Sequence, residues 1–346
     1  MVRFASRRGP ARLALALAAA LTAALVAVAC GASSGTASVA RKHRAHVTTL
    51  RMVFDWPGID FEAVPITVGN ARGYYKKAGL NVQIVIPPST STTVQMLAAG
   101  RGDIGFDTTT DVVFAQKAGI DVKSIANYSQ DNNWGLVAPP GKKIDIKKIK
   151  GKSIGIFTDS WTKAMMPYVL EAGHVTASQI RQPIFSSDDI APLLAGKIDL
   201  ATNTVNYAIA QIQSTTGKRP SVLLATKFGA PNVPIWVYTA TTSWLKQHGK
   251  QAKAFLSATR KAMAWSIAHP AAAVKDYLAA YPKIGGGMKY SLAGWKATIP
   301  ALGKKSKLLT QRKSQWTQVA HALKSVGLLP KPLAASKYFT NKYLKH

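Results

Sequence analysis

Three observations in the 346-residue sequence predict an α/β fold. The apolar run Leu50–Phe54 ends at Asp55-Trp56-Pro57-Gly58, a strong turn signal, and a helical pattern from Val64 to Tyr75 follows it. The same succession begins afresh at Ser153–Phe157. From Ser243 onward the pattern is mainly helical. Strands that alternate with helices are typical of sheets covered by helices.

The composition suits an ordinary folded core with a very basic surface. Hydrophobic residues make up 47%, and 45 Lys+Arg against 15 Asp+Glu give a formal charge of +30. Such an excess of positive charge is typical of proteins that bind nucleic acid or an anionic surface. The lysines are spread along the chain, however, with no zinc spacing or RNA-binding signature. We therefore expect a solvated basic surface and no nucleic-acid partner.

The amino terminus predicts export. Four arginines precede the apolar run Leu13–Ala29, and small residues follow it, which is the pattern of a secretory signal peptide. Ala27-Val28-Ala29-Cys30 is similar to a bacterial lipobox, so we expect residues 1–29 to be removed and Cys30 to carry a lipid anchor in the membrane. Plain secretion with an incidental cysteine is the alternative. Residues 30–48 are predicted to be a disordered tether.

Polar residues at strand ends are the first candidates for a binding site, because α/β sheets bind ligands there. Asp55 and Trp56 follow the first strand, and Thr108, Thr109 and Asp111 open a helix after a later one. Hydroxyls and backbone N–H groups at a helix start can bind a polar or anionic ligand. A simple capping box explains the same residues equally well.

Several phrases, in order, resemble one family. Asp55-Trp56-Pro57, the helix end Gly73-Tyr74-Tyr75-Lys76-Lys77-Ala78-Gly79-Leu80 and the Ile144–Ile156 segment are similar to parts of SsuA/THI5-like (NMT1/THI5) proteins. That resemblance extends from about Leu50 to the end of the chain. It implies a two-lobe periplasmic-binding-protein fold, type II-like, with a ligand cleft between the lobes. Lobe I would comprise residues 49–143 and 234–346, and lobe II residues 144–233.

The resemblance also implies a function. Proteins of this kind close around a small solute and deliver it to the permease and ATPase subunits of an ABC importer, as extracytoplasmic monomers. Asp55-Trp56 points to a thiamin-precursor-like pyrimidine, although Gly58-Ile59-Asp60-Phe61-Glu62 departs from the loop usual in that branch. An alkanesulfonate, taurine or nitrate, or a ligand-sensing ectodomain, stay open as alternatives.

The expected ligand-binding residues lie at strand ends and in loops, and about half of the aromatic ones are expected to touch ligand while the others pack between lobes. They are Asp55, Trp56, Phe61, Glu62, Thr108, Thr109, Asp111, Asn132, Trp134, Thr158, Ser160, Trp161, Asn203, Thr204, Tyr207 and Trp236.

Motifs of catalysis are missing from the sequence. A nucleophile elbow, a Walker loop and a paired-histidine metal motif are all absent. The single cysteine, Cys30, cannot supply the cysteine-rich active segment of the yeast pyrimidine synthase relatives. The sequence therefore predicts no enzyme activity, no cofactor and no metal site.

Overall fold

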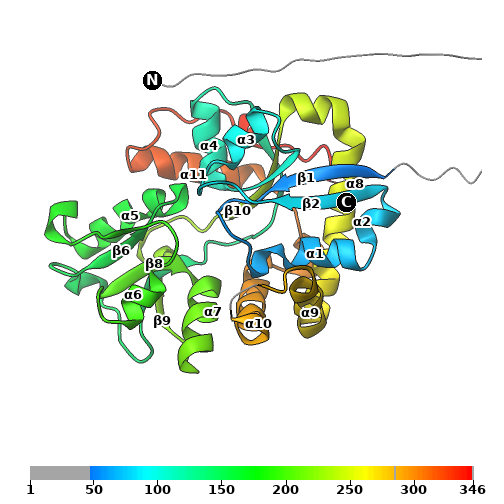
Figure 1. Ribbon diagram of the computed structural model, residues 1–346. Helices are drawn as coiled ribbons and strands as arrows, with labels where there is room; N and C mark the ends of the chain where they lie inside the picture. The colour runs from blue at the N-terminus through cyan, green and yellow to red at the C-terminus, as the bar shows by residue number, and fades with distance from the viewer. Residues whose placement is uncertain (1–46, 284–285, 345–346) are drawn as a thin grey trace, which may run out of the picture. The chain divides into compact units, whose positions relative to one another are not determined.

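The computed structural model describes residues 47–283 and 286–344 (Figure 1). The predicted signal peptide, Cys30 and almost all of the tether lie outside these residues. Within the described ranges, no helix is both long enough and apolar enough to cross a membrane.

Two five-stranded sheets form the framework. The first is mixed: β1 runs parallel to β2 and β3, whereas β10 is antiparallel to β3 and β4. Its strands, in spatial order, are β2 (Leu80–Val85), β1 (Thr48–Val53), β3 (Ile104–Thr108), β10 (Trp236–Thr241) and β4 (Val122–Asn127).

The second sheet repeats this plan with other strands. Here β6 is parallel to β7 and β8, and β5 is antiparallel to β8 and β9. The spatial order is β7 (Ile184–Phe185), β6 (Ile154–Phe157), β8 (Leu200–Thr204), β5 (Trp134–Ala138) and β9 (Ser221–Leu224).

Helices connect the strands and make up most of the carboxyl-terminal third, as predicted (Figure 1). They are α1 (Val64–Ala71), α2 (Tyr74–Lys77), α3 (Thr93–Ala98), α4 (Thr109–Lys117), α5 (Ser160–Gly173), α6 (Ile190–Leu194), α7 (Val205–Thr216), α8 (Thr242–Ala268), α9 (Pro270–Ala280), α10 (Gly287–Thr298), α11 (Lys313–Ser325) and α12 (Ala335–Tyr338).

The first helix is shorter than its sequence pattern predicts. The pattern runs from Val64 to Tyr75, but α1 ends at Ala71 and α2 begins at Tyr74. Gly73 between them has a φ of 71°, a left-handed conformation that glycine adopts without a steric penalty. The turn directs Tyr75 into the core, where its hydroxyl contacts that of Thr259 at 2.7 Å.

Strand β5 belongs to the second sheet. The expected lobe boundary at residues 143–144 assigns it to lobe I, whereas the structure pairs it with β8 and β9. All five of its residues are buried, so their pattern gives no sign of which sheet they join. The sheets are thus connected by two crossings, residues 128–133 and residues 229–235, and β10 belongs to the first sheet.

The two crossings are hydrogen-bonded to each other. The Asn132 backbone N–H donates to Asn232 Oδ1 at 3.0 Å, and Asn132 Nδ2 donates to the Pro231 carbonyl at 3.0 Å. Ser129 Oγ accepts from the backbone N–H groups of Ile235 and Trp236, both at 3.1 Å.

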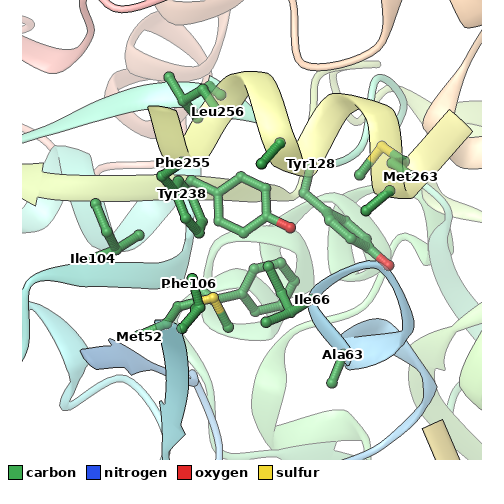
Figure 2. Close-up of a cluster of buried hydrophobic side chains, with 14 of the residues drawn as sticks. Met52, Ala63, Ile66, Ile104, Phe106, Tyr128, Tyr238, Phe255, Leu256 and Met263 are labelled. Carbon is green, nitrogen blue, oxygen red and sulfur yellow. The ribbon is translucent and has the colours of Figure 1, made fainter. Parts of the chain in front are cut away.

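An aromatic core lies between the first sheet and α8. Figure 2 shows Phe255, Leu256 and Met263 of α8 near Phe106 and other buried side chains of the sheet. The ring of Phe106 stacks on that of Trp236, with centroids 5.4 Å apart and planes 15° from parallel. This core therefore supports an aromatic side chain that faces the pocket described next.

Candidate functional site

One cavity is lined by residues from both sheets. Its volume of about 270 Å³ is close to the lower end of the range for small-ligand sites, about 300–1,000 Å³. The contributing segments are the loops after β1, β2 and β7, the beginning of β5, the end of β6 with the beginning of α5, the end of β8 with α7, the crossing into β10, and α10. Strand ends therefore form most of the site, as the position of ligands in α/β sheets predicts.

Aromatic side chains form much of the wall. They are Trp56, Trp134, Phe157, Trp161, Tyr207, Trp236 and Tyr290. The rings of Trp56 and Trp236 lie 5.1 Å apart between centroids. Trp134 is oriented by its indole N–H, which donates to Thr162 Oγ1 at 3.1 Å. The indole N–H of Trp161 is buried without a partner among the described residues, so it is a donor available to a ligand.

Four carboxyl groups line the same cavity, those of Asp55, Asp60, Glu62 and Asp159. Among the described residues, the lining contains no lysine, arginine or histidine. In a protein with a formal charge of +30, this local excess of acid is opposite in sign to the whole molecule. The site is therefore electrostatically suited to N–H donors and cations.

Asp55 is the most deeply placed of these groups. It is 0% exposed, and neither carboxylate oxygen has a hydrogen-bond partner among the described residues. Burial, together with the nearby carboxylates of Asp111 and Asp107, raises its pKa well above the ordinary value. A ligand that supplied N–H donors to Asp55 would satisfy these oxygens.

Asp60 and Glu62 form a pair at the short turn η1 (Phe61–Ala63), which contains Glu62 and has Asp60 as its N-cap. Asp60 Oδ1 accepts from the Glu62 backbone N–H at 3.2 Å, and burial raises the pKa of Asp60 to about 6. Glu62 Oε1 accepts from Asn206 Nδ2, while Glu62 Oε2 is buried without a partner among the described residues. Burial and the charge of Asp60 raise the pKa of Glu62 well above its usual range.

Asp159 is the N-cap of α5 and the fourth carboxyl group of the lining. Its carboxylate accepts from the Thr162 backbone N–H at 2.6 Å and from Thr162 Oγ1 at 2.7 Å. Burial raises the pKa of Asp159 to about 6. The cap thus fixes Thr162, which in turn accepts the Trp134 indole hydrogen bond.

A buried aspartate outside the lining positions the polar end of β8. Asp189 Oδ1 accepts from Asn203 Nδ2 at 3.0 Å, and Asp189 Oδ2 accepts from the Thr202 backbone N–H at 3.1 Å. Asn203 and Thr202 both line the cavity. Burial raises the pKa of Asp189 to about 7.

The structure brings many of the expected site residues together. Those in the lining are Asp55, Trp56, Glu62, Trp134, Trp161, Asn203, Thr204, Tyr207 and Trp236. The expected residues outside the lining are Phe61, Thr108, Thr109, Asp111, Asn132, Thr158 and Ser160.

Local structure accounts for most of the residues outside the lining. Thr108 and Asp111 form the capping box of α4, the alternative that the sequence left open. Thr108 Oγ1 and Ser160 Oγ lie 2.9 Å apart, and Thr109 Oγ1 donates to the Pro234 carbonyl at 2.9 Å. Asn132 bonds the two crossings together.

Phe61 and Thr158 also lie away from the cavity. The Phe61 ring is 0% exposed and packs 5.7 Å from the ring of Tyr290, between centroids. Thr158 is exposed, and its backbone N–H donates to the Phe185 carbonyl at 2.9 Å.

Some lining residues were not expected from the sequence. Asp60 and Asp159 each stand next to an expected residue, so the strand-end rule could have included them. Ser186 and Ser187 follow the very short β7. Tyr290 comes from α10, and no local signal connects it with the loops it faces.

The fold and the site define a class of protein: two sheets joined by two crossings, with a small-molecule pocket lined by both, form a periplasmic-binding-protein fold. Residues 60–273 match the profile of the "NMT1/THI5 like" family, and the chain belongs to that family. Both findings confirm what the resemblance predicted.

The known proteins that are similar to this chain include both enzymes and binding proteins, as their names state. A 4-amino-5-hydroxymethyl-2-methylpyrimidine phosphate synthase of Saccharomyces cerevisiae, THI13, is 24% identical over 299 residues, covering 81% of this chain and 84% of its own. The alkanesulfonate-binding protein SsuA of Xanthomonas axonopodis pv. citri, bound to MOPS, is similar in structure, with a TM-score of 0.63 and 14% identity, covering 84% of this chain and 98% of its own.

A third similar protein is the ligand-binding component of an ABC-type import system from Staphylococcus aureus. Its TM-score is 0.63 at 12% identity, and the match covers 85% of this chain and 97% of that one. At these identities the likeness shows the fold. The prediction that this chain is not an enzyme needs correction, because its relatives of known sequence include proteins named as synthases.

Proposed function

We propose that this protein captures a small solute outside the cytoplasm and delivers it to the permease of an ABC importer. The observation that carries the proposal is the pocket, which residues of both sheets line together. A change in the angle at the two crossings would open and close such a pocket, as hinged domain closure does in periplasmic binding proteins. The Staphylococcus aureus protein of similar fold is named as an importer component.

The preferred solute is a planar, nitrogen-rich ring of the thiamin-precursor type. Trp56 and Trp236 offer apolar faces against which a ring can pack. The unpartnered oxygens of Asp55 and Glu62 accept hydrogen bonds, so an amino group or a protonated ring nitrogen satisfies them. The relatives named as hydroxymethylpyrimidine phosphate synthases act in the chemistry of such a ring.

An alkanesulfonate is the second candidate, favoured by the similarity in structure to SsuA. In this pocket a sulfonate would find neutral donors such as the Trp161 indole N–H and the hydroxyls of Ser186 and Ser187. It would also face four carboxyl groups with no lysine or arginine in the described lining to offset them. Electrostatics therefore favour the nitrogen-rich ring.

Calorimetric titration of the purified chain distinguishes the two ligands. One arm uses 4-amino-5-hydroxymethyl-2-methylpyrimidine and the other uses MOPS and a short alkanesulfonate. We expect the pyrimidine to bind and Trp236→Ala to weaken it at least tenfold. The control is Trp244→Ala, because Trp244 packs on His248 outside the pocket. Binding of the sulfonates alone supports the second candidate, and binding of neither class contradicts solute capture by this pocket.

The solute recovered from the same titration also shows whether the protein changes it chemically. After titration, the solute is recovered and its mass is compared with that of the starting compound. An unchanged mass, with binding, supports capture for transport. A changed mass would assign the pocket to a synthase-like reaction, in line with the names of the relatives.

Export and anchoring are part of the proposal. The signal peptide and Cys30 would place the folded chain outside the membrane as a lipid-anchored monomer. Fractionation of cells that express the full chain, and of a Cys30→Ser variant, tests this. We expect the parent chain in the membrane fraction with the mass of an added lipid, and the variant in the medium or periplasm. Recovery of both in the same fraction would contradict the anchor.

A further inference from the structure

Three buried carboxyl groups meet beside the pocket. Asp55 follows β1, Asp107 lies in β3 and Asp111 lies in the first turn of α4. One carboxylate oxygen of each lies within 4.8 Å of the others. They are 0%, 0% and 4% exposed. The fold gathers them because β1 and β3 are parallel neighbours and α4 begins directly after β3.

Hydrogen bonds satisfy only part of this carboxylate cluster. Asp107 Oδ2 accepts from Thr239 Oγ1, and Asp111 Oδ2 accepts from the hydroxyl of Thr108 at 2.6 Å and from its backbone N–H at 3.2 Å. Both oxygens of Asp55 and Oδ1 of Asp107 are buried with no partner among the described residues. The salt bridges found in the described part of the chain involve other carboxylates.

Unpaired carboxylates held this close in a buried space need a positive charge or protons. We propose that Asp55, Asp107 and Asp111 bind a divalent metal ion of the calcium class. Calcium takes oxygen ligands at about 2.3–2.6 Å, so two oxygens on one ion are up to about 5 Å apart, which suits the observed spacing. The cluster contains no histidine or cysteine, which disfavours zinc and copper.

A hydroxyl next to the cluster supplies a further oxygen ligand. Ser91 is half-buried, and its side chain lies against the Asp111 carboxylate, whose pKa burial raises and a hydrogen bond from Ser91 lowers. The Ser91 backbone N–H donates to the Asp55 carbonyl at 3.2 Å, which places this residue beside the cluster. Asp55 belongs to both the cluster and the pocket lining; one of its oxygens is the ligand of the ion, and the other stays free to accept a hydrogen bond from the solute.

Titration with metal ions tests the site, and the positive net charge of the protein reduces binding of cations elsewhere on the surface. With a formal charge of +30, the surface repels divalent cations, so weak surface binding is suppressed. The full chain is freed of metal with a chelator and titrated with Ca²⁺, and in parallel with Tb³⁺, whose luminescence a nearby tryptophan sensitises. We expect one equivalent to bind.

Variants locate the ion. Asp107→Asn and Asp111→Asn lie outside the pocket lining, and each should weaken Ca²⁺ binding at least tenfold. Asp131→Asn, at an exposed position, is the matched control and should bind as the parent does. Ca²⁺ should raise the melting temperature of the parent and of the control, but not that of the two cluster variants. In chelator the cluster variants should be at least as stable as the parent, because each removes one of the crowded charges.

Two results would overturn the proposal: no uptake of Ca²⁺, Mg²⁺ or Mn²⁺ by the parent chain, or equal uptake by the parent and both cluster variants. The titration uses no solute, so its failure would leave the proposed solute function untouched.

Discussion

Replacing Asp189 by asparagine tests how a buried carboxyl group makes the stability of this protein depend on pH. Asp189 is 0% exposed, and burial raises its pKa from an ordinary value of 3.8 to about 7 despite hydrogen bonds from Asn203 and Thr202. An acid whose pKa is higher in the folded state than in the unfolded state binds more protons when folded. The free energy of unfolding therefore falls as pH rises through the interval between these values.

The magnitude follows from the size of the pKa rise. One pKa unit corresponds to about 1.36 kcal/mol, so a rise of about three units removes on the order of 4 kcal/mol of stability between pH 4 and pH 8. The contribution is fully present below about pH 4 and lost above about pH 7. Asp60 and Asp159, whose pKa values burial raises to about 6, act in the same direction in the parent chain.

Asparagine at position 189 cannot ionise, and its single oxygen can accept only one of the two hydrogen bonds. We expect Asp189→Asn to lower the free energy of unfolding by about 1 kcal/mol at pH 3.5, where the parent keeps nearly all of this contribution, through the lost bond, and to raise it above that of the parent at pH 8. Urea unfolding followed by tryptophan fluorescence at several pH values gives both curves. Asp131→Asn, at an exposed position, should follow the parent throughout. Parallel curves for Asp189→Asn and the parent would refute the assigned ionisation.

Three further substitutions test packing, a buried hydrogen bond and the pocket. Gly294→Ala would place a Cβ 2.3 Å from the Phe61 ring, so we expect a loss of about 1–3 kcal/mol in urea unfolding, and an unchanged midpoint would contradict this packing. Tyr75→Phe removes the 2.7 Å contact with Thr259 and should cost about 0.5–1.5 kcal/mol, whereas a gain would show that the hydroxyl is not bonded. Trp56→Ala should weaken pyrimidine binding at least tenfold by calorimetry, and equal affinity would place the ring elsewhere in the lining.

The sequence predicts the elements of this fold better than it predicts their partners. The runs Leu50–Phe54 and Ser153–Phe157 carry local patterns of apolar residues and turn signals, and β1 and β6 lie where those patterns indicate. Strand β5 has the same kind of pattern, yet it joins the second sheet. Which strands pair in a sheet depends on hydrogen bonds to segments that are distant in the sequence. The residues of a short, fully buried strand therefore do not show which strands it will pair with.

The site shows the same division between local and distant information. Trp56 and Trp134 stand at strand ends and were predictable from position alone. Thr108 and Asp111 also stand at a strand end, but the orphan N–H groups of α4 use their side chains as a capping box. Tyr290 reaches the pocket from a helix far along the chain, which no local pattern reveals.

The hydrogen bonds between the two crossings have a mechanical consequence. Because Asn132 and Ser129 bond residues 231–236, the segments 128–133 and 229–235 cannot bend independently. A rotation that flexes both segments about a common axis preserves these bonds, whereas a twist that slides one past the other breaks them. We therefore expect the connection between the two sheets to bend about one axis and to resist twisting about any other.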